Sequence, residues 1–165
     1  MNKPHEWRSH PALRGRFHPQ HLDDVQVIVH EGGPRITPTK PELVWVRGSD
    51  VRGEIFTGKI LSGPSQIRTL SQGDEIQFIV PSSAKHPLLV TEKYLRERPE
   101  WVIHPCDKCG FTELFDCPSE LVRVILPRSP DNAVPEAFTT FCGICGGIHF
   151  VERVDAMLDE NEPFS

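Results

Sequence analysis

The chain reads LVWVRGSDVRGEIFTGKIL over residues 43–61, and this stretch decides the fold class. Two runs rich in β-branched, aliphatic and aromatic residues, 43–46 and 55–61, flank the turn-forming segment 49–53. Short runs of this kind bounded by Gly, Ser and Asp are typical of strands joined by a turn. Gly53 is free to adopt the positive φ that a tight turn often needs. The stretch therefore predicts two antiparallel strands.

Similar runs on either side extend this pattern. They cover residues 25–29 and 75–80 and are also bounded mostly by turn-forming residues. Residues 22–81 are therefore predicted to form a small antiparallel sheet or barrel, in which Trp45, within its apolar run, is expected in the core.

The rest of the chain is predicted to hold one helix and further strands. Residues 91–98 begin with Thr, carry an acidic residue in the first turn and basic residues in the last, and precede Pro99, which is typical of a short helix. The runs at 121–126, 138–141 and 148–153 are typical of strands. With 16 prolines spread along the chain, long helices are not expected. The predicted fold class is α+β, mostly β.

Four of the five cysteines form two Cys-x2-Cys pairs, and these are the strongest functional signal. The pairs are Cys106 with Cys109 and Cys142 with Cys145, each followed directly by Gly and separated by 32 residues. A Cys-x2-Cys pair of this kind forms a zinc knuckle, a tight turn that directs two thiolates at one ion. Two knuckles supply four thiolates to a closed tetrahedral site, the arrangement of structural Zn²⁺. The predicted cofactor is one structural zinc ion. Because the spacer exceeds the roughly 15–20 residues of common ribbons, residues 114–137 are expected to loop out as an insertion.

Other uses of these cysteines were weighed. A dithiol redox site needs its first Cys at a helix N-terminus, whereas Gly146 and Gly147 follow the second pair. A zinc deaminase needs a His-x-Glu or Cys-x-Glu triplet, and none precedes Cys106. A catalytic zinc using His104 or His149 would need an open position, which four thiolates do not leave. Dithiol redox chemistry stays as an alternative.

The remaining candidates are weaker. Cys117 is expected to be a small buried side chain, and His18 and His21 were weighed as a second metal site but are more simply solvated or core histidines. Trp101 is expected to pack over the zinc unit, and Trp7 to contact a partner. The sequence contains no nucleophile elbow, phosphate-binding loop or dinucleotide fingerprint. No catalytic or cofactor-binding residue is therefore predicted.

Composition and charge limit the partners. The chain has 165 residues, 38% of them hydrophobic, and its longest apolar run is only the four residues 43–46, so no membrane span and a cytoplasmic location are expected. The net charge is −5: residues 1–100 carry 14 basic and 12 acidic side chains, residues 101–165 carry 4 and 11. A region this acidic is poorly suited to a phosphate backbone. A protein partner is expected, and a nucleic-acid-binding zinc ribbon is the alternative.

These patterns predict four consecutive regions. They are a basic Pro- and His-rich arm at 1–20, a small β-rich domain ending in a helix at 21–100, a zinc-ribbon-like unit at 101–154 and an acidic tail at 155–165.

The motif Gly53-x2-Phe56-x-Gly58 and the later Gly73-Asp74-x-Ile76-x-Phe78, together with residues 43–46, resemble a widespread bacterial small β-domain of unknown function. They are also distantly similar to domains proposed as immunity proteins of bacterial toxin systems. Residues 16–153 resemble uncharacterised bacterial proteins in which this domain is joined to a zinc-ribbon-like unit through the segment 104–110. The resemblance implies a fold and a zinc site but no reaction.

Overall fold

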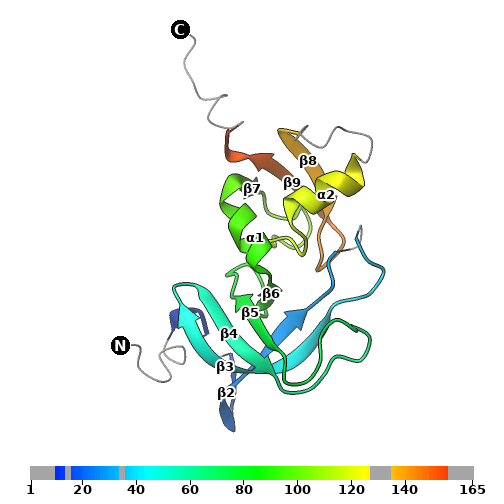
Figure 1. Ribbon diagram of the computed structural model, residues 1–165. Coiled ribbons are helices and arrows are strands. Elements are labelled where there is room, and N and C mark those ends of the chain that lie inside the picture. Colours follow the sequence, from blue (N-terminus) through cyan, green and yellow to red (C-terminus); the bar gives the residue numbers. More distant parts are fainter. Residues whose placement is uncertain (1–9, 14–15, 34–35, 127–134, 156–165) are drawn as a thin grey trace. The chain divides into compact units, whose positions relative to one another are not determined.

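The computed structural model describes residues 10–13, 16–33, 36–126 and 135–155. Two compact units make up the chain: Met1–Glu31 with Thr39–Thr91, and Gly32–Pro38 with Glu92–Ser165. Each unit contains one β-sheet (Figure 1). Trp7 and all of the predicted acidic tail except Asp155 lie outside the described residues.

The first unit is built on a six-stranded sheet. Its elements are η2 (Pro11–Leu13), β1 (Phe17–His18), β2 (His21–Val29), β3 (Glu42–Arg52), β4 (Ile55–Ile60), β5 (Glu75–Ile79) and β6 (Leu88–Val90). Neighbouring strands are antiparallel in the order β1 to β6, and a parallel pairing of Ile28 with Leu88 joins β2 to β6. Strands β2 to β6 thus close into a small barrel, which confirms the predicted sheet or barrel.

The two central strands show why this sequence forms a closed sheet. Gly53 makes the turn between β3 and β4 with a φ of 60°. Further along, Gly58 pairs with Gly48 beside an irregularity in the β3 register. A Cβ at Gly58 would stand 2.6 Å from Val46 Cγ1 and 2.7 Å from the Arg47 carbonyl oxygen. Gly58 therefore permits the close approach of β4 to β3.

The core lies on one face of this sheet. Alternate residues of β3 point inward, so Val44 and Val46 are buried, and Phe56 stacks on Phe78 across β4 and β5 with ring centroids 5.4 Å apart. The prediction for Trp45 was wrong: it is half-buried on the opposite face, 5.0 Å from the His18 ring. The two-residue period of a strand places it there, because its neighbours fill the core.

The described part of the predicted arm packs on the sheet. Leu13 is fully buried in the barrel core, and Phe17 packs against that core from β1. Arg16 donates hydrogen bonds to the carbonyl oxygens of Lys85 and Ala84. Residues 10–13 and 16–20 therefore belong to the first unit, which their Pro- and His-rich composition did not indicate.

Two carboxylates hold the long connection between β4 and β5. Glu42 accepts the backbone N–H groups of Ser65, Gln66 and Ile67 at 2.9 to 3.1 Å and the Ser65 hydroxyl at 2.6 Å. The Ser65 hydroxyl, followed by these N–H groups, lowers the pKa of Glu42 to about 2. Glu31 accepts the next N–H group, from Arg68, at 2.8 Å.

The second unit contains a three-stranded antiparallel sheet and two helices. Its elements are α1 (Glu92–Glu97), η3 (Arg98–Glu100), β7 (Trp101–Ile103), α2 (Pro118–Ile125), β8 (Ala137–Phe141) and β9 (Ile148–Arg153), with β9 between β7 and β8. The predicted helix and the two predicted C-terminal strands are confirmed. Trp101 is buried and packs edge-on against Phe138 of β8, with centroids 5.5 Å apart. The fold class, α+β and mostly β, is also confirmed.

Residues 121–126 do not form the predicted strand but most of α2. Pro118 opens this helix directly after Cys117, whose backbone is extended. Leu121 and Val122 are buried while Arg123 is exposed, so the helix is amphipathic. Glu97 of α1 accepts the Ser119 N–H and hydroxyl at 2.9 and 2.7 Å, which anchors the first turn. These contacts outweigh the strand propensity of its Val and Ile residues.

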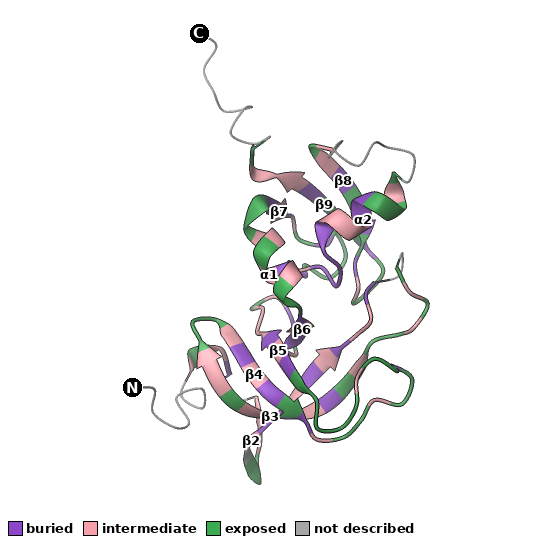
Figure 2. Ribbon diagram, viewed as in Figure 1, coloured by how far each residue is buried: buried purple, intermediate pink, exposed green. Residues whose placement is uncertain are grey.

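The described part of the spacer between the knuckles does not loop out. Its first residues, Leu114, Phe115, Asp116 and Cys117, are all buried (Figure 2). Tyr94 of α1 accepts the Leu114 N–H at 3.0 Å. Residues 114–126 are therefore part of the packed second unit, and the expected insertion was wrong over this range.

Asp116 is a buried carboxylate in this segment. Its Oδ2 accepts the Gly33 N–H at 2.7 Å, and a Cβ at Gly32 would stand 2.3 Å from its Oδ1. Burial, opposed by the Gly33 hydrogen bond, raises the pKa of Asp116 to about 6. The two glycines thus let the backbone approach a carboxylate that titrates close to neutral pH.

Candidate metal centre

The first knuckle follows β7. The Cys106 N–H donates to the Phe111 carbonyl oxygen at 2.9 Å, and the Gly110 N–H returns to the Cys106 carbonyl oxygen at 3.0 Å. Gly110 has a φ of 78°, which explains why Gly follows the second cysteine. The Lys108 N–H points at Cys106 Sγ from 3.4 Å. The backbone therefore wraps round one sulfur atom.

The second knuckle joins β8 to β9 and repeats this geometry. The Gly146 N–H donates to the Cys142 carbonyl oxygen at 3.0 Å, and Gly146 has a φ of 77°. The Ile144 N–H lies 3.4 Å from Cys142 Sγ, and the Gly147 N–H lies 3.4 Å from Cys145 Sγ. Two turns 32 residues apart in the sequence thus present their sulfur atoms in the same way.

The two knuckles bring the four cysteines singled out by their spacing into one cluster. All four Sγ atoms lie within 4.8 Å of one another, with Cys106 and Cys145 3.4 Å apart and Cys109 and Cys142 3.7 Å apart. None forms a disulfide. A tetrahedral ion with metal–sulfur bonds of about 2.3 Å needs sulfur atoms about 3.8 Å apart. The cluster therefore has the dimensions of a four-thiolate metal site.

The surroundings of the four cysteines by themselves disfavour ionisation of all four thiols. Burial raises the pKa of Cys109 and raises that of Cys142 to about 12. Burial also opposes ionisation of Cys106, but the N–H groups of Cys109 and Lys108 lower its pKa to about 7. Thiolate sulfur is the preferred ligand of soft and borderline cations such as Zn²⁺. A bound divalent cation would thus supply the positive charge that stabilises four thiolates at this site.

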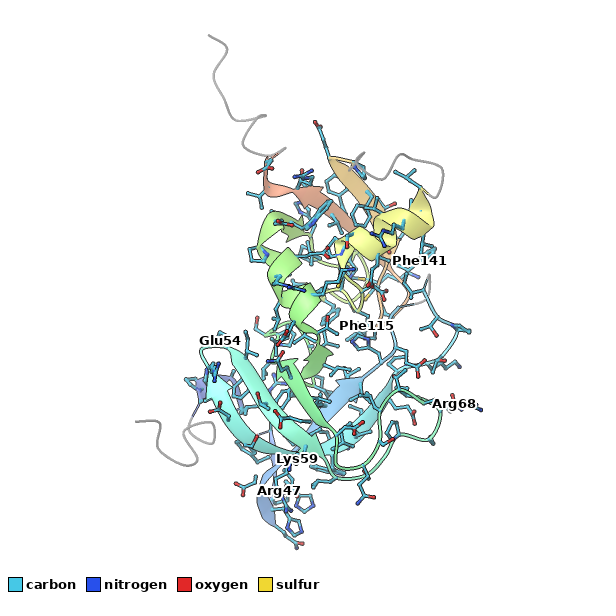
Figure 3. All side chains as sticks on the ribbon, viewed as in Figure 1. Arg47, Glu54, Lys59, Arg68, Phe115 and Phe141 are labelled. Carbon is cyan, nitrogen blue, oxygen red and sulfur yellow. The ribbon has the colours of Figure 1, made fainter. Side chains whose placement is uncertain are left out.

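Two glycines let the surroundings close around the cluster. A Cβ at Gly147 would stand 2.5 Å from Cys106 Sγ, and a Cβ at Gly143 would stand 2.6 Å from the ring of Phe115, which Figure 3 labels. Asp107 adds a cross-link by accepting the Ile148 N–H at 2.8 Å. Asp107 and Phe115 support the cluster, but neither carries a local sequence signal that would predict this role.

The two nearby histidines lie outside the cluster. His149 is fully buried on β9, its Nδ1 is 2.8 Å from the His104 carbonyl oxygen, and its Nε2 has no partner among the described atoms. His104 Nε2 lies 2.5 Å from Glu152 Oε2. The group of potential metal ligands contains cysteines alone.

The other sequence candidates stay apart from this site. Cys117 is buried directly before α2, as expected for a small apolar side chain. The rings of His18 and His21 lie 4.9 Å apart, but His18 Nδ1 accepts the Gln20 N–H at 3.0 Å. In the part of the chain that is described, the four-cysteine cluster is the one group with three or more potential ligands.

Comparisons of the chain with protein-family models, with curated proteins and with solved structures give no match. The resemblance to a bacterial small β-domain with a zinc-ribbon-like unit stays a prediction. Across the described ranges no helix is both long enough and apolar enough to cross a membrane.

Proposed function

We propose that this chain is a non-catalytic zinc-binding protein that acts by binding another protein. Cys106, Cys109, Cys142 and Cys145 hold one structural Zn²⁺ in a zinc-ribbon-like unit. The observation that carries this proposal is the convergence of four sulfur atoms within 4.8 Å from two turns of matching geometry.

A structural role is the best use of this site. Four thiolates complete the tetrahedral coordination of Zn²⁺ and leave no position for water or substrate. The second unit has a three-stranded sheet and two short helices, and in zinc-finger peptides structural zinc contributes about 10 to 16 kcal/mol to folding. The ion would therefore link the knuckle that follows β7 to the knuckle that joins β8 to β9.

An exposed apolar face supports a protein partner. Phe141 of β8, labelled in Figure 3, is directly paired with Ile148 of β9, and Phe150 lies two residues further along the same face. These side chains are 43%, 46% and 43% exposed, and Ile144 in the intervening knuckle is 44% exposed. Large apolar side chains gathered in this way mark interaction surfaces. We call Phe141, Ile148 and Phe150 the β8–β9 face.

The two alternatives have less support. Residues 101–165 carry 11 acidic and 4 basic side chains, and a four-thiolate zinc site adds negative charge, so a nucleic-acid backbone would be repelled. For dithiol redox chemistry, neither knuckle stands at a helix N-terminus, the position that favours a reactive thiolate.

Chemical cross-linking followed by affinity capture from cells tests the proposal. The full chain is compared with a variant carrying Phe141→Thr and Phe150→Thr, which removes two rings but keeps strand-forming residues. Val124→Ala, which trims an exposed apolar side chain of α2, is the matched control. We expect a protein that wild type and control capture and the double variant loses. Capture of nucleic acid by the second unit, or substrate turnover by the zinc-loaded chain, would contradict the proposal.

A further inference from the structure

A pocket in the first unit gathers positive charge without an acidic side chain. It has a volume of about 220 Å³ and is lined by Arg16, Val25, Gln26, Lys85, His86 and Pro87. Three of these side chains are cationic or can become so, and the others are apolar or neutral. The pocket is smaller than a drug-binding cleft but exceeds the roughly 150 Å³ that holds a benzene molecule. It therefore suits a small ligand.

The guanidinium of Arg16 is held in place by the fold. Arg16 donates to the carbonyl oxygens of Lys85 at 2.8 Å and of Ala84 at 3.3 Å, so its guanidinium is fixed against the turn before β6. That turn is tied to β2 by the Ile28 N–H, which donates to the Pro87 carbonyl oxygen at 2.8 Å. A pre-positioned guanidinium loses little freedom when a ligand binds.

The positive charge of the pocket is not balanced by the described residues around it. None of their ion pairs involves Arg16, Lys85 or His86. Burial lowers the pKa of His86, and the charges of Lys85 and Arg16 lower it further. From β2, the pocket is lined by Val25 and Gln26, which carry no charge. An anion placed here would be stabilised by two permanent cations and would favour protonation of His86.

We propose that this pocket binds the phosphate group of a small phosphomonoester. Phosphate carries a charge of about −1.5 to −2 at neutral pH and offers three acceptor oxygens, which matches Arg16, Lys85 and His86. Val25 and Pro87 complete the lining of the pocket without adding charge, and the Gln26 amide can donate to the ligand. This inference goes beyond the proposed function and does not depend on zinc.

The test is an NMR titration of the full-length, zinc-loaded chain with inorganic phosphate and with phenyl phosphate. We expect saturable shifts confined to Gln26, Lys85, His86 and their neighbours with both ligands, because both present the same phosphate group to the pocket. Lys85→Gln should weaken binding about tenfold, as expected for loss of one charge-assisted contact. Lys59→Gln, at an exposed lysine of β4 labelled in Figure 3, should leave binding unchanged.

A second readout separates this site from general attraction of anions. Binding should raise the pKa of His86, so sulfate, which keeps its charge while histidine titrates, should bind more tightly as the pH falls, and His86→Gln should remove that dependence. Equal weakening by Lys59→Gln and Lys85→Gln, or the absence of saturable shifts, would overturn the proposal. So would a single-stranded oligonucleotide that displaces phenyl phosphate at equal phosphate concentration, because the ligand would then be a nucleic acid.

Discussion

Gly147 lies directly against Cys106: a Cβ at position 147 would stand 2.5 Å from Cys106 Sγ and 2.8 Å from Asp107 Oδ1. The two residues belong to different knuckles, so this contact fixes how closely the knuckles approach. The sulfur atom cannot move away without disturbing Asp107, whose carboxylate accepts the Ile148 N–H. A glycine at this position is therefore required by the four-sulfur geometry rather than by its own backbone angle.

Gly147→Ala should distort the metal centre. The added methyl group would displace Cys106 Sγ, so a Co²⁺-substituted variant should lose the absorption bands of a tetrahedral thiolate site, and its metal affinity should fall at least about tenfold, or about 1.4 kcal/mol. Gly110→Ala is the comparison. Nothing lies within 4 Å of a Cβ there, but its φ is 78°, so we expect about 1 kcal/mol of lost stability with an unchanged Co²⁺ spectrum. Identical spectra for both variants and wild type would refute this explanation.

Removal of the metal should unfold the second unit but not the first. After denaturing chelation and refolding in chelator, amide signals of β7, β8 and β9 should collapse, while those of β2 to β6 stay dispersed because the barrel has its own core. Cys142→Ser should give the same spectrum without chelator. Cys117→Ala, which changes a buried cysteine outside the cluster, should keep its metal and its signals. An unchanged circular dichroism spectrum after chelation would show that the metal is not structural.

The pKa of Asp116 predicts a pH-dependent stability. Burial raises this pKa from 3.8 to about 6, so the folded state holds the proton more tightly than the unfolded chain. The stabilisation is complete below the ordinary value and is lost as the pH rises through about 6. Asp116→Asn, which keeps an acceptor for the Gly33 N–H, should therefore be more stable than wild type above this pH, by up to about 3 kcal/mol.

Thermal unfolding of the zinc-loaded proteins at a series of pH values measures this difference. The gap between Asp116→Asn and wild type should shrink as the pH falls. Glu100→Gln, at an exposed acidic residue of the same unit, should follow wild type throughout. A constant gap across the series would mean that Asp116 does not titrate in this range.

Glu42 should control the order of the connection between β4 and β5. Replacing it with Gln removes the negatively charged carboxylate that accepts hydrogen bonds from the N–H groups of Ser65, Gln66 and Ile67. We expect faster hydrogen exchange at these three amides and little change elsewhere in the barrel. Glu75→Gln, at an exposed residue of β5, should leave these exchange rates as they are. Protection that survives Glu42→Gln would assign the order of this segment to other contacts.

Local patterns carried most of what the sequence could predict. Strands β2 to β5 and the helix at 92–97 were predicted because their apolar runs, turn residues and helix-end residues are local, whereas β6, which closes the barrel, was not predicted. The four cysteines were found because knuckle spacing and the following Gly reflect the geometry of a single turn. These are features that a short segment fixes by itself.

Features set by tertiary contacts were missed. Residues 121–126 contain Val and Ile and read as a strand, yet Pro118 and the contact of Ser119 with Glu97 make them helical. Trp45 lies outside the core because Val44 and Val46 fill the inner face of its strand. Phe115 supports the knuckle at Gly143 from a segment predicted to loop out. The contacts of Ser119 with Glu97 and of Phe115 with Gly143 have no signature in the neighbouring residues, whereas the two-residue period of the strand and Pro118 at the first helical position are local signals.

A structural zinc site at the four cysteines is tested most directly by elemental analysis of the untagged full chain, combined with a count of reactive thiols before and after denaturation in chelator. We expect one zinc ion per chain, with the thiols of Cys106, Cys109, Cys142 and Cys145 released only on denaturation. The absence of metal, with two disulfides or freely reactive pairs in its place, would rule out a structural zinc site and favour dithiol redox chemistry.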